Sequence, residues 1–175
     1  MNKSVDIFDY AGNICKALGK GVLLTTSADG KVNTMTIGWG TLGIEWNKPV
    51  FIAYVRESRY TCQLLDQNPE FTVNIPMDEL DSNILRHCGR TSGRDTDKIA
   101  DLGLTTVPSD HISVPGIREL PLTIECRVIY RKEQDLGLLP EAVLKRFYPV
   151  AGESGFRDYH IAFYGEIVNA YIAGE

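Results

Sequence analysis

The sequence lacks a long apolar run and an excess of basic residues. No segment approaches the roughly 18 apolar residues that a membrane span needs, and the N-terminus has no continuous apolar core of the kind found in signal peptides. We therefore expect no membrane partner and a cytoplasmic location. Acidic residues number 23 against 18 basic ones, for a formal net charge of −5. Nucleic acid is not expected as a partner, because binding many phosphates needs the opposite balance.

Clustered cysteines and recognisable catalytic triads are also missing. The four cysteines lie far apart, without CxxC or Cys/His ligand spacing, at Cys15, Cys62, Cys88 and Cys126. This argues against a metal site and against a disulfide framework, and it predicts reduced thiols that are mostly packed. Neither a Ser/His/Asp order nor paired carboxylates stand out, so hydrolysis by a nucleophile is not supported. The absence of GxGxxG means that a nicotinamide nucleotide would have no dinucleotide fold to occupy.

The sequence does contain β-rich runs separated by short helical segments, which we interpret as one domain spanning residues 1–175. Apolar residues at helical spacing before Gly19 predict a helix over 5–18. An Asp-Gly pair between two β-rich runs predicts an antiparallel hairpin of 21–27 and 31–40. Pro49 opens a third strand over 50–55, Asn68-Pro69 ends a helix over 58–67, and a fourth strand follows over 71–75.

The second half of the chain ends in two long β-rich runs. Before them, Asp78 is interpreted as the N-cap of a helix that ends at Gly89, and a polar loop leads to a short helix started by Asp95 and stopped by Gly103. The β-rich runs cover 120–132 and 159–172, with a helical turn or two predicted at 141–147. About six strands with short helices between them predict a mainly β fold, a six-stranded antiparallel barrel.

The stretch NTMTIGWGTLG, residues 33–43, has glycines on both sides of its Trp. Alternation places the bulky residues from Asn33 to Trp39 on one face and Thr34, Thr36 and Gly38 on the other. Glycine is tolerated in a strand where a ligand or another backbone comes close. A flat ligand could lie against the row of hydroxyls and bare backbone; the alternative is a tight packing position or a bulge.

Two further segments carry candidate anion ligands. In YVRESRYT, residues 54–61, Ser58 suits the N-cap of a helix beginning at Arg59, where free amides and nearby Arg side chains would bind a phosphate. The alternative is an ordinary cap whose arginines pair with Glu57 or Asp66. In GRTSGRDTDKI, residues 89–99, flexible backbone and three cations suit a loop that closes over an anion. Nearby aspartates could equally pair these cations in solvent.

The three histidines give weaker signals. His87 is adjacent to Cys88 and projects in another direction, and His111 has no identifiable partner. His160 lies on the last long strand among aromatic residues. It could bond a polar ligand, or it could be a satisfied histidine of the core.

Taken together, these segments resemble the flavin reductase-like family of FMN-binding split barrels, which includes flavoredoxin-type proteins. The resemblance runs from about residue 10 to residue 172. It rests on the order and spacing of NTMTIGW (33–39), RESRYT (56–61) before a short helix, FTVNIP (71–76), SGRDTDK (92–98) and YHIAFYGEIV (159–168). The family more often has Ser at the position of Gly38, and residues 133–158 remain unmatched, which leaves the substrate side open.

The resemblance implies a split barrel that forms a homodimer and holds one FMN in each groove near the subunit interface. Carried over by position, the residues implied for the flavin and ribityl groove are Asn33, Thr36, Ile37, Gly38 and Trp39. Those implied for the phosphate are Arg56, Ser58, Arg59 and Thr61. Ser92, Arg94 and Lys98 would close over the cofactor, and His160 would face the ring.

Three functions are compatible with this interpretation. The first is an oxidoreductase that passes electrons from NAD(P)H through bound FMN to a small-molecule or protein acceptor. The second is an FMN-containing electron carrier, reduced by a partner protein. The third is a binding module without a redox cofactor. One FMN site would explain three separate weak signals, which favours the first two.

Overall fold

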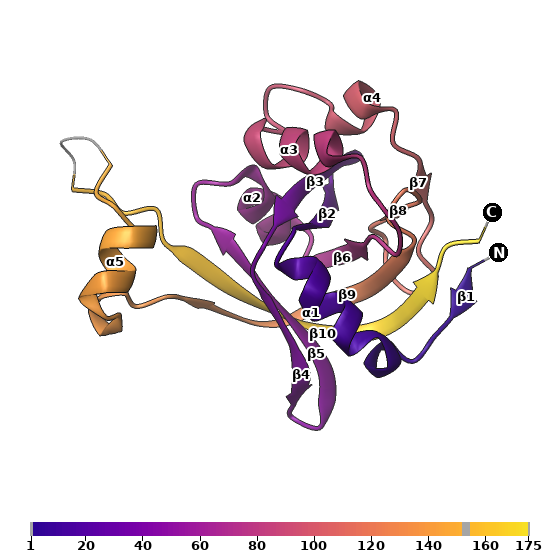
Figure 1. Cartoon of the computed structure of the whole chain (residues 1–175), viewed down its shortest axis with the longest axis horizontal. Coiled ribbons are helices and arrows are strands. Elements are labelled where there is room, and N and C mark those ends of the chain that lie inside the picture. The colour runs from indigo at the N-terminus through magenta and orange to yellow at the C-terminus, as the bar shows by residue number, and fades with distance from the viewer. Residues whose placement is uncertain (1, 152–154, 175) are drawn as a thin grey trace.

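The computed structural model describes residues 2–151 and 155–174. Its strands are β1 (Lys3–Ser4), β2 (Val22–Ala28), β3 (Lys31–Ile37), β4 (Gly40–Glu45), β5 (Lys48–Arg56), β6 (Glu70–Ile75), β7 (Thr106–Val107), β8 (Gly116–Ile117), β9 (Leu122–Glu133) and β10 (His160–Ile172). Its helices are α1 (Ala11–Leu18), α2 (Tyr60–Gln67), α3 (Ser82–Arg90), α4 (Lys98–Leu102) and α5 (Glu141–Phe147), with 3-10 turns at Ile7–Tyr10 and Leu136–Leu138 (Figure 1).

One antiparallel sheet organises the molecule. Seven strands follow the order β3-β2-β6-β9-β10-β5-β4, and β1 joins as an eighth by pairing with β10. The predicted mainly β, split-barrel fold is confirmed, although the sheet is not closed, since β3 and β4 at its two ends do not pair with each other in the described part of the chain. As a result, β3 is an edge strand that pairs only with β2.

The number of strands exceeds the predicted six, because β4 and the two-residue strands β1, β7 and β8 were missed. The predicted second strand ends at Ile37, and the chain starts a new strand at Gly40. β4 and β5 are joined by a turn in which Trp46 and Asn47 both have positive φ. This is the backbone of a tight hairpin turn without the usual glycine, so its signal in the sequence is weak. The predicted Asp29-Gly30 hairpin is present, with positive φ at both residues.

The helices form close to where they were predicted, but their starts are displaced, and α3 continues past the predicted stop at Gly89 to Arg90. Asp81 caps α3 in place of Asp78, and Asp97 caps α4 in place of Asp95. The helix predicted over 5–18 is α-helical only from Ala11. Several aspartates precede each apolar run, and the sequence does not say which one reaches a free amide. Gly103 ends α4 in the left-handed conformation, as predicted.

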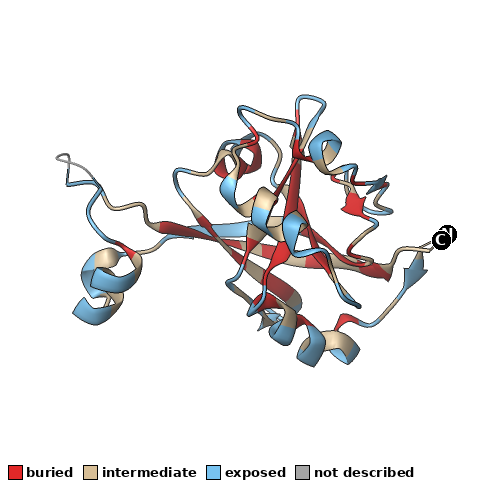
Figure 2. Ribbon diagram, turned by 45° about the horizontal axis from the view of Figure 1, so that its top comes forward, coloured by how far each residue is buried: buried red, intermediate tan, exposed pale blue. Residues whose placement is uncertain are grey.

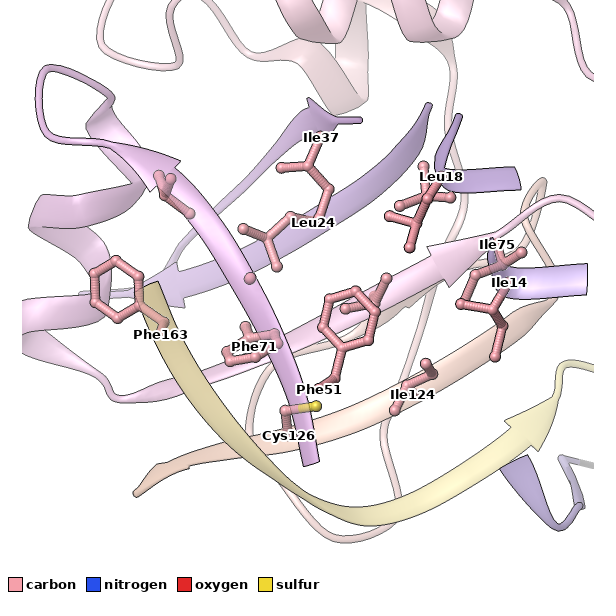
Figure 3. Close-up of a cluster of buried hydrophobic side chains, with 14 of the residues drawn as sticks. Ile14, Leu18, Leu24, Ile37, Phe51, Phe71, Ile75, Ile124, Cys126 and Phe163 are labelled. Atoms are coloured by element: carbon pink, nitrogen blue, oxygen red, sulfur yellow. The ribbon is translucent and has the colours of Figure 1, made fainter. Parts of the chain in front are cut away.

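Two apolar layers flank the sheet. On one side α1 contributes Ile14 and Leu18 to a core that also contains Phe51, Phe71 and Phe163, which Figures 2 and 3 show at the centre of the curved sheet. On the other side a smaller cluster joins the sheet to α3 and to the segment after α4; it consists of Leu23, Cys88, Leu104, Ile117 and Leu120. The sheet is therefore covered on both faces.

The described residues of the segment left unmatched by the sequence, 133–151 and 155–158, belong to an arm. The distal ends of β9 and β10 extend away from the body and carry α5 at their tip (Figure 1). The helix itself is mostly exposed (Figure 2). At its base, the arm returns to the end of β5, where β10 pairs His160 with Arg56.

All four cysteines are free thiols, and Cys62, Cys88 and Cys126 are buried as predicted. Burial raises the pKa of Cys62 to about 12 and that of Cys88 to about 11, so both remain protonated. Within residues 2–151 and 155–174, no group of three potential metal ligands gathers. No helix in this part of the chain is long and apolar enough to cross a bilayer.

Gly165 offers a test of sheet packing. A Cβ at this position would lie 2.5 Å from Cζ of Phe71 and 2.7 Å from Cβ of Cys126, whereas a Cβ at Gly43 meets nothing within 4 Å. We expect Gly165→Ala to lower the free energy of unfolding by about 1–3 kcal/mol through overpacking. The matched control Gly43→Ala is expected to stay within about 0.5 kcal/mol of wild type. Urea denaturation measures both; equal stabilities for the two variants would contradict the packing described here.

Candidate functional site

Two adjoining cavities lie along β3, each with a volume of about 190 Å³. The first is lined by Asn33, Met35, Ser58, Arg59, Tyr60, Thr61, Thr91, Ser92, Gly93, Arg94, Lys98 and Asp158. The second is lined by Met35, Thr36, Ile37, Gly38, Trp39, Tyr54, Arg56, Arg59 and His160. Met35 and Arg59 border both cavities, so together they form one elongated site, at the lower end of the roughly 300–1,000 Å³ typical of ligand pockets.

The site exists because β3 is an edge strand. The carbonyl of Thr34 accepts a hydrogen bond from Nζ of Lys98, so it points away from β2. Backbone groups alternate in direction along an antiparallel strand, and those of Thr36 therefore also face outward. A ligand in the site would meet the outward peptide groups of Thr36 rather than a further strand.

The predicted row of free hydroxyls is not available. The hydroxyl of Thr34 contacts that of Thr25 at 3.1 Å, and the hydroxyl of Thr36 donates to the carbonyl of Leu85 on α3 at 2.7 Å. The interpretation that these hydroxyls face a ligand is therefore wrong for Thr34, which is fully buried and lines neither cavity. Thr36 still lines the second cavity.

The wall of the first cavity contains an unsatisfied polar atom. The Asn33 side chain is 4% exposed; its Nδ2 donates to the Thr61 hydroxyl at 3.3 Å, while its Oδ1 has no partner in the described part of the chain. Any Cβ at Gly93 would collide with this oxygen. A buried acceptor without a partner costs free energy, so the site favours a ligand that donates a hydrogen bond there.

Lys98 is a buried cation beside the same cavity. Its side chain is 4% exposed, and Nζ donates to the carbonyls of Thr34 at 2.9 Å and Cys88 at 3.1 Å. Burial lowers its pKa, and the nearby Arg59 adds to this effect. No carboxylate pairs with it within the described ranges. An anion in the cavity would therefore compensate a charge that is otherwise poorly solvated.

Two arginines border the first cavity. Arg59 lines both cavities, and its guanidinium makes no hydrogen bond or ion pair with any residue that the structure describes. Arg94 donates to the carbonyl of Ser58 at 3.2 Å and lies over the ring of Tyr60. Ser92 accepts a hydrogen bond from the amide of Arg94. Within the described residues, neither Arg59 nor Arg94 forms an ion pair with a carboxylate. Asp66, which the sequence offered as a partner for the arginines of residues 54–61, pairs with Arg131 instead.

Ser58 does not cap α2. The helix begins at Tyr60 with Arg59 as its N-cap, and no side chain bonds the free amides. The prediction that Ser58 is the N-cap is therefore wrong. Its amide and hydroxyl instead hold the carboxylate of Asp158, at 3.1 Å and 2.8 Å. This contact spans 100 residues of chain and could not be read from local sequence.

Arg56 is engaged by the base of the arm. Its guanidinium donates to the carbonyls of Asp158 at 2.6 Å and Phe147 at 2.9 Å, and it lies over the ring of Tyr148. Arg56 borders the second cavity and is absent from the lining of the first. The arrangement fixes the arm against the end of β5 and places Phe147 edge-on against Trp39, with ring centroids 5.2 Å apart.

His160 is held in one tautomer at the second cavity. The Tyr148 hydroxyl donates to Oε1 of Gln134 at 2.7 Å and lies 2.8 Å from Nδ1 of His160. A phenol has one proton, so this hydrogen-bond pattern assigns a proton to Nδ1 and leaves Nε2 as an acceptor. Burial, together with the charge of Arg56, lowers the pKa of His160 to about 4. The imidazole is therefore neutral near pH 7, beside Trp39.

The thirteen residues predicted for the site all line one of the two cavities. Seven border the first and seven the second, with Arg59 shared. The lining also contains six residues that were not predicted for the site: Met35, Tyr54, Tyr60, Thr91, Gly93 and Asp158. Tyr60 lies within the motif that predicted the phosphate site, and its aromatic ring beside Lys31 and Arg94 is the signal that could have identified it.

Known proteins resemble the chain in sequence and in structure. It is 33% identical over 114 residues to an uncharacterized protein of Archaeoglobus fulgidus, a match that covers 65% of this chain and 62% of that protein. The chain thus matches less than two thirds of this curated relative.

Two solved structures share its fold. Flavoredoxin of Desulfovibrio vulgaris (Miyazaki F) matches with a TM-score of 0.66 and 25% identity, covering 87% of this chain and 69% of that one. Flavoredoxin from Methanosarcina acetivorans matches with a TM-score of 0.64 and 26% identity, covering 87% and 68%.

The family is established by the sequence itself. Residues 16–175 match the model of the flavin reductase like domain. This match includes every segment that builds the two cavities, from β3 to β10. The resemblance inferred from the motifs is confirmed, and the chain belongs to the flavin reductase like domain family.

Proposed function

We propose that this chain binds FMN and acts as an NAD(P)H-dependent oxidoreductase, passing electrons to a small-molecule or protein acceptor. The observation that carries the proposal is the elongated site along β3. Cations and hydrogen-bond donors gather at its first cavity, and aromatic residues with exposed peptide groups gather at its second. FMN consists of a phosphate, a polyhydroxyl chain and a flat ring system in this order, which matches the order of the groups along the site.

The first cavity suits the phosphate and the ribityl chain. Arg59 and Arg94 supply charge-assisted donors, and free amides at the start of α2 add to them. The unpaired Oδ1 of Asn33 is an acceptor for a ribityl hydroxyl. Arg56 was predicted here as well, but its guanidinium already bonds two carbonyls of the arm, so its contact with the phosphate stays a prediction.

The second cavity suits the ring. Outward peptide groups of β3 and the bare backbone of Gly38 offer hydrogen bonds to its polar edge, and Trp39 and His160 border the same space. When bound, FMN would supply the electron-accepting chemistry, and the protein needs only to position it and set its electrostatics. Lys98, a cation without a carboxylate partner in the described chain, lines the first cavity and would stabilise negative charge on the part of the cofactor that lies there.

An electron carrier reduced by a partner protein is the second candidate. It is favoured by the similarity to two flavoredoxins at 25% and 26% identity. The family and the site are the same for both candidates, and they differ in whether NAD(P)H is the reductant. The sequence has no dinucleotide motif, so in the first candidate the reductant binds transiently at the second cavity.

We also propose a homodimer and a cytoplasmic location. Large apolar side chains are exposed on the β4–β5 hairpin and on the arm, including Ile44, Trp46, Tyr130 and Leu138. Apolar side chains gathered on protruding elements are typical of a protein interface. The free thiols fit a reducing compartment.

The proposal is tested by the visible spectrum of the purified protein, followed by anaerobic mixing with NADH and NADPH. We expect the absorption of bound, oxidised flavin, which bleaches with at least one nucleotide. A flavin spectrum that both nucleotides leave unchanged would support the electron carrier. A colourless protein that takes up no added FMN would contradict both candidates.

Arg59 gives a direct test of the phosphate end. We expect Arg59→Ala to weaken FMN binding by about 1.5–3 kcal/mol, the usual size of a hydrogen bond to a charged group. Titration of FMN with fluorescence detection measures the change. Arg118→Ala removes the same charge from an exposed residue that lines neither cavity and should bind like wild type. Wild-type affinity in Arg59→Ala would remove Arg59 from the site.

His160 makes stability depend on pH. Its pKa of about 4 lies below the ordinary value of 6.5, so the unfolded chain binds more protons between these values. The contribution of His160 to the free energy of unfolding is therefore fully present above about pH 6.5 and is lost as the pH falls toward 4. This loss amounts to up to about 3 kcal/mol.

Comparison with His160→Gln isolates this component from the titration of carboxylates. Urea denaturation between pH 4.5 and 7 should give a shallower decline for the variant than for wild type. Parallel pH profiles of the two proteins would show that His160 does not have the lowered pKa.

A further inference from the structure

Asp158 brings a carboxylate into the first cavity. It lines this cavity together with Arg59 and Arg94, although neither arginine forms an ion pair with it. Its two oxygens accept hydrogen bonds from the amide and the hydroxyl of Ser58. These are two of the donors that the sequence predicted for a phosphate. The protein's own anion therefore occupies part of an anion site.

A second observation indicates that the first cavity favours a ligand with a hydrogen-bond donor. Asn33, whose side chain is 4% exposed, lines the same cavity, and its buried Oδ1 has no partner among the described residues. The Asp158 carboxylate cannot satisfy this atom, because both are acceptors. A ligand with an anionic end and hydroxyl groups satisfies the cations and Asn33 together.

The backbone and the side chain of Asp158 are held separately. Its carbonyl accepts from Arg56, and the neighbouring carbonyl of Tyr159 accepts from the amide of Glu57, so the main chain is tied to the end of β5. Among the residues that the structure describes, the carboxylate is bonded only by Ser58, and Asp158 is partly exposed. Rotation of the side chain can release Ser58 while the arm stays in place.

We propose that Asp158 competes with the phosphate of the flavin for the first cavity and thereby sets how strongly the protein prefers FMN over the phosphate-free riboflavin. The inference rests on the proposed function and deepens it. Two like charges within one small cavity repel each other, so the phosphate must displace the carboxylate or bind against its field. Riboflavin carries no such charge, and Asp158 leaves its affinity unaffected.

The test compares the dissociation constants of FMN and riboflavin by quenching of flavin fluorescence. Asp158→Asn keeps the size of the side chain and an acceptor for Ser58 but removes the charge. We expect it to tighten FMN binding about tenfold, equivalent to about 1.4 kcal/mol, and to change riboflavin affinity less than about twofold. Asp158→Glu retains the charge and should keep the wild-type ratio of the two affinities.

Glu141→Gln is the matched control for net charge. Glu141 is exposed on α5 and pairs only with Lys145, so this variant should leave both affinities unchanged. Asp158→Ala serves as a second charge-removing variant if Asp158→Asn does not fold. Unchanged or weaker FMN binding in the charge-removing variants, with riboflavin still bound, would overturn the role of Asp158 but not the proposed function. No binding of either flavin to any form, wild type included, would overturn the proposed function and this inference with it.

Discussion

The buried ammonium of Lys98 ties the helical layer to the edge of the sheet, and the candidate site depends on this contact. Lys98, on α4, donates to the carbonyl of Thr34 on β3 and to that of Cys88 on α3. The contact fixes α3 and α4 beside β3, which pairs with no strand on its outer side in the described chain. The rest of the strand's outer edge stays open to a ligand. Because burying an ammonium without a carboxylate is costly, the same contact that organises the wall also favours an anion beside it.

A second constraint connects the site to the arm. Arg56 at the end of β5 bonds carbonyls of Phe147 and Asp158, which places one aromatic residue against Trp39 and one carboxylate against Ser58. The arm thus lines the first cavity through Asp158, and through Phe147 it contacts Trp39, a residue of the second cavity. A family fold shared with flavoredoxins leaves room for such a segment to set the properties of one particular member.

Much of the fold and of the site could be predicted, for local reasons. The hairpin at Asp29-Gly30, the left-handed Gly103 and the change from strand to helix after Arg56 each depend on a few neighbouring residues. β4 was missed because its turn uses Trp46, a bulky residue that seldom adopts positive φ, and Asn47 stands where a glycine would have marked the turn. The role of Ser58 was wrong because its true partner, Asp158, lies 100 residues away.

The sequence by itself, through the motifs that resemble a known family, determined thirteen of the residues that border the two cavities, because the order and spacing of those motifs are properties of the sequence alone. Only the tertiary structure decided what each of them faces. Alternation along β3 defines two faces but not which of them a helix will cover, and the packing of α3 over Thr36 settles that question. The partners of Arg56, Ser58 and Lys98 likewise come from distant segments, because burial leaves a polar group only the partners that the folded chain brings to it.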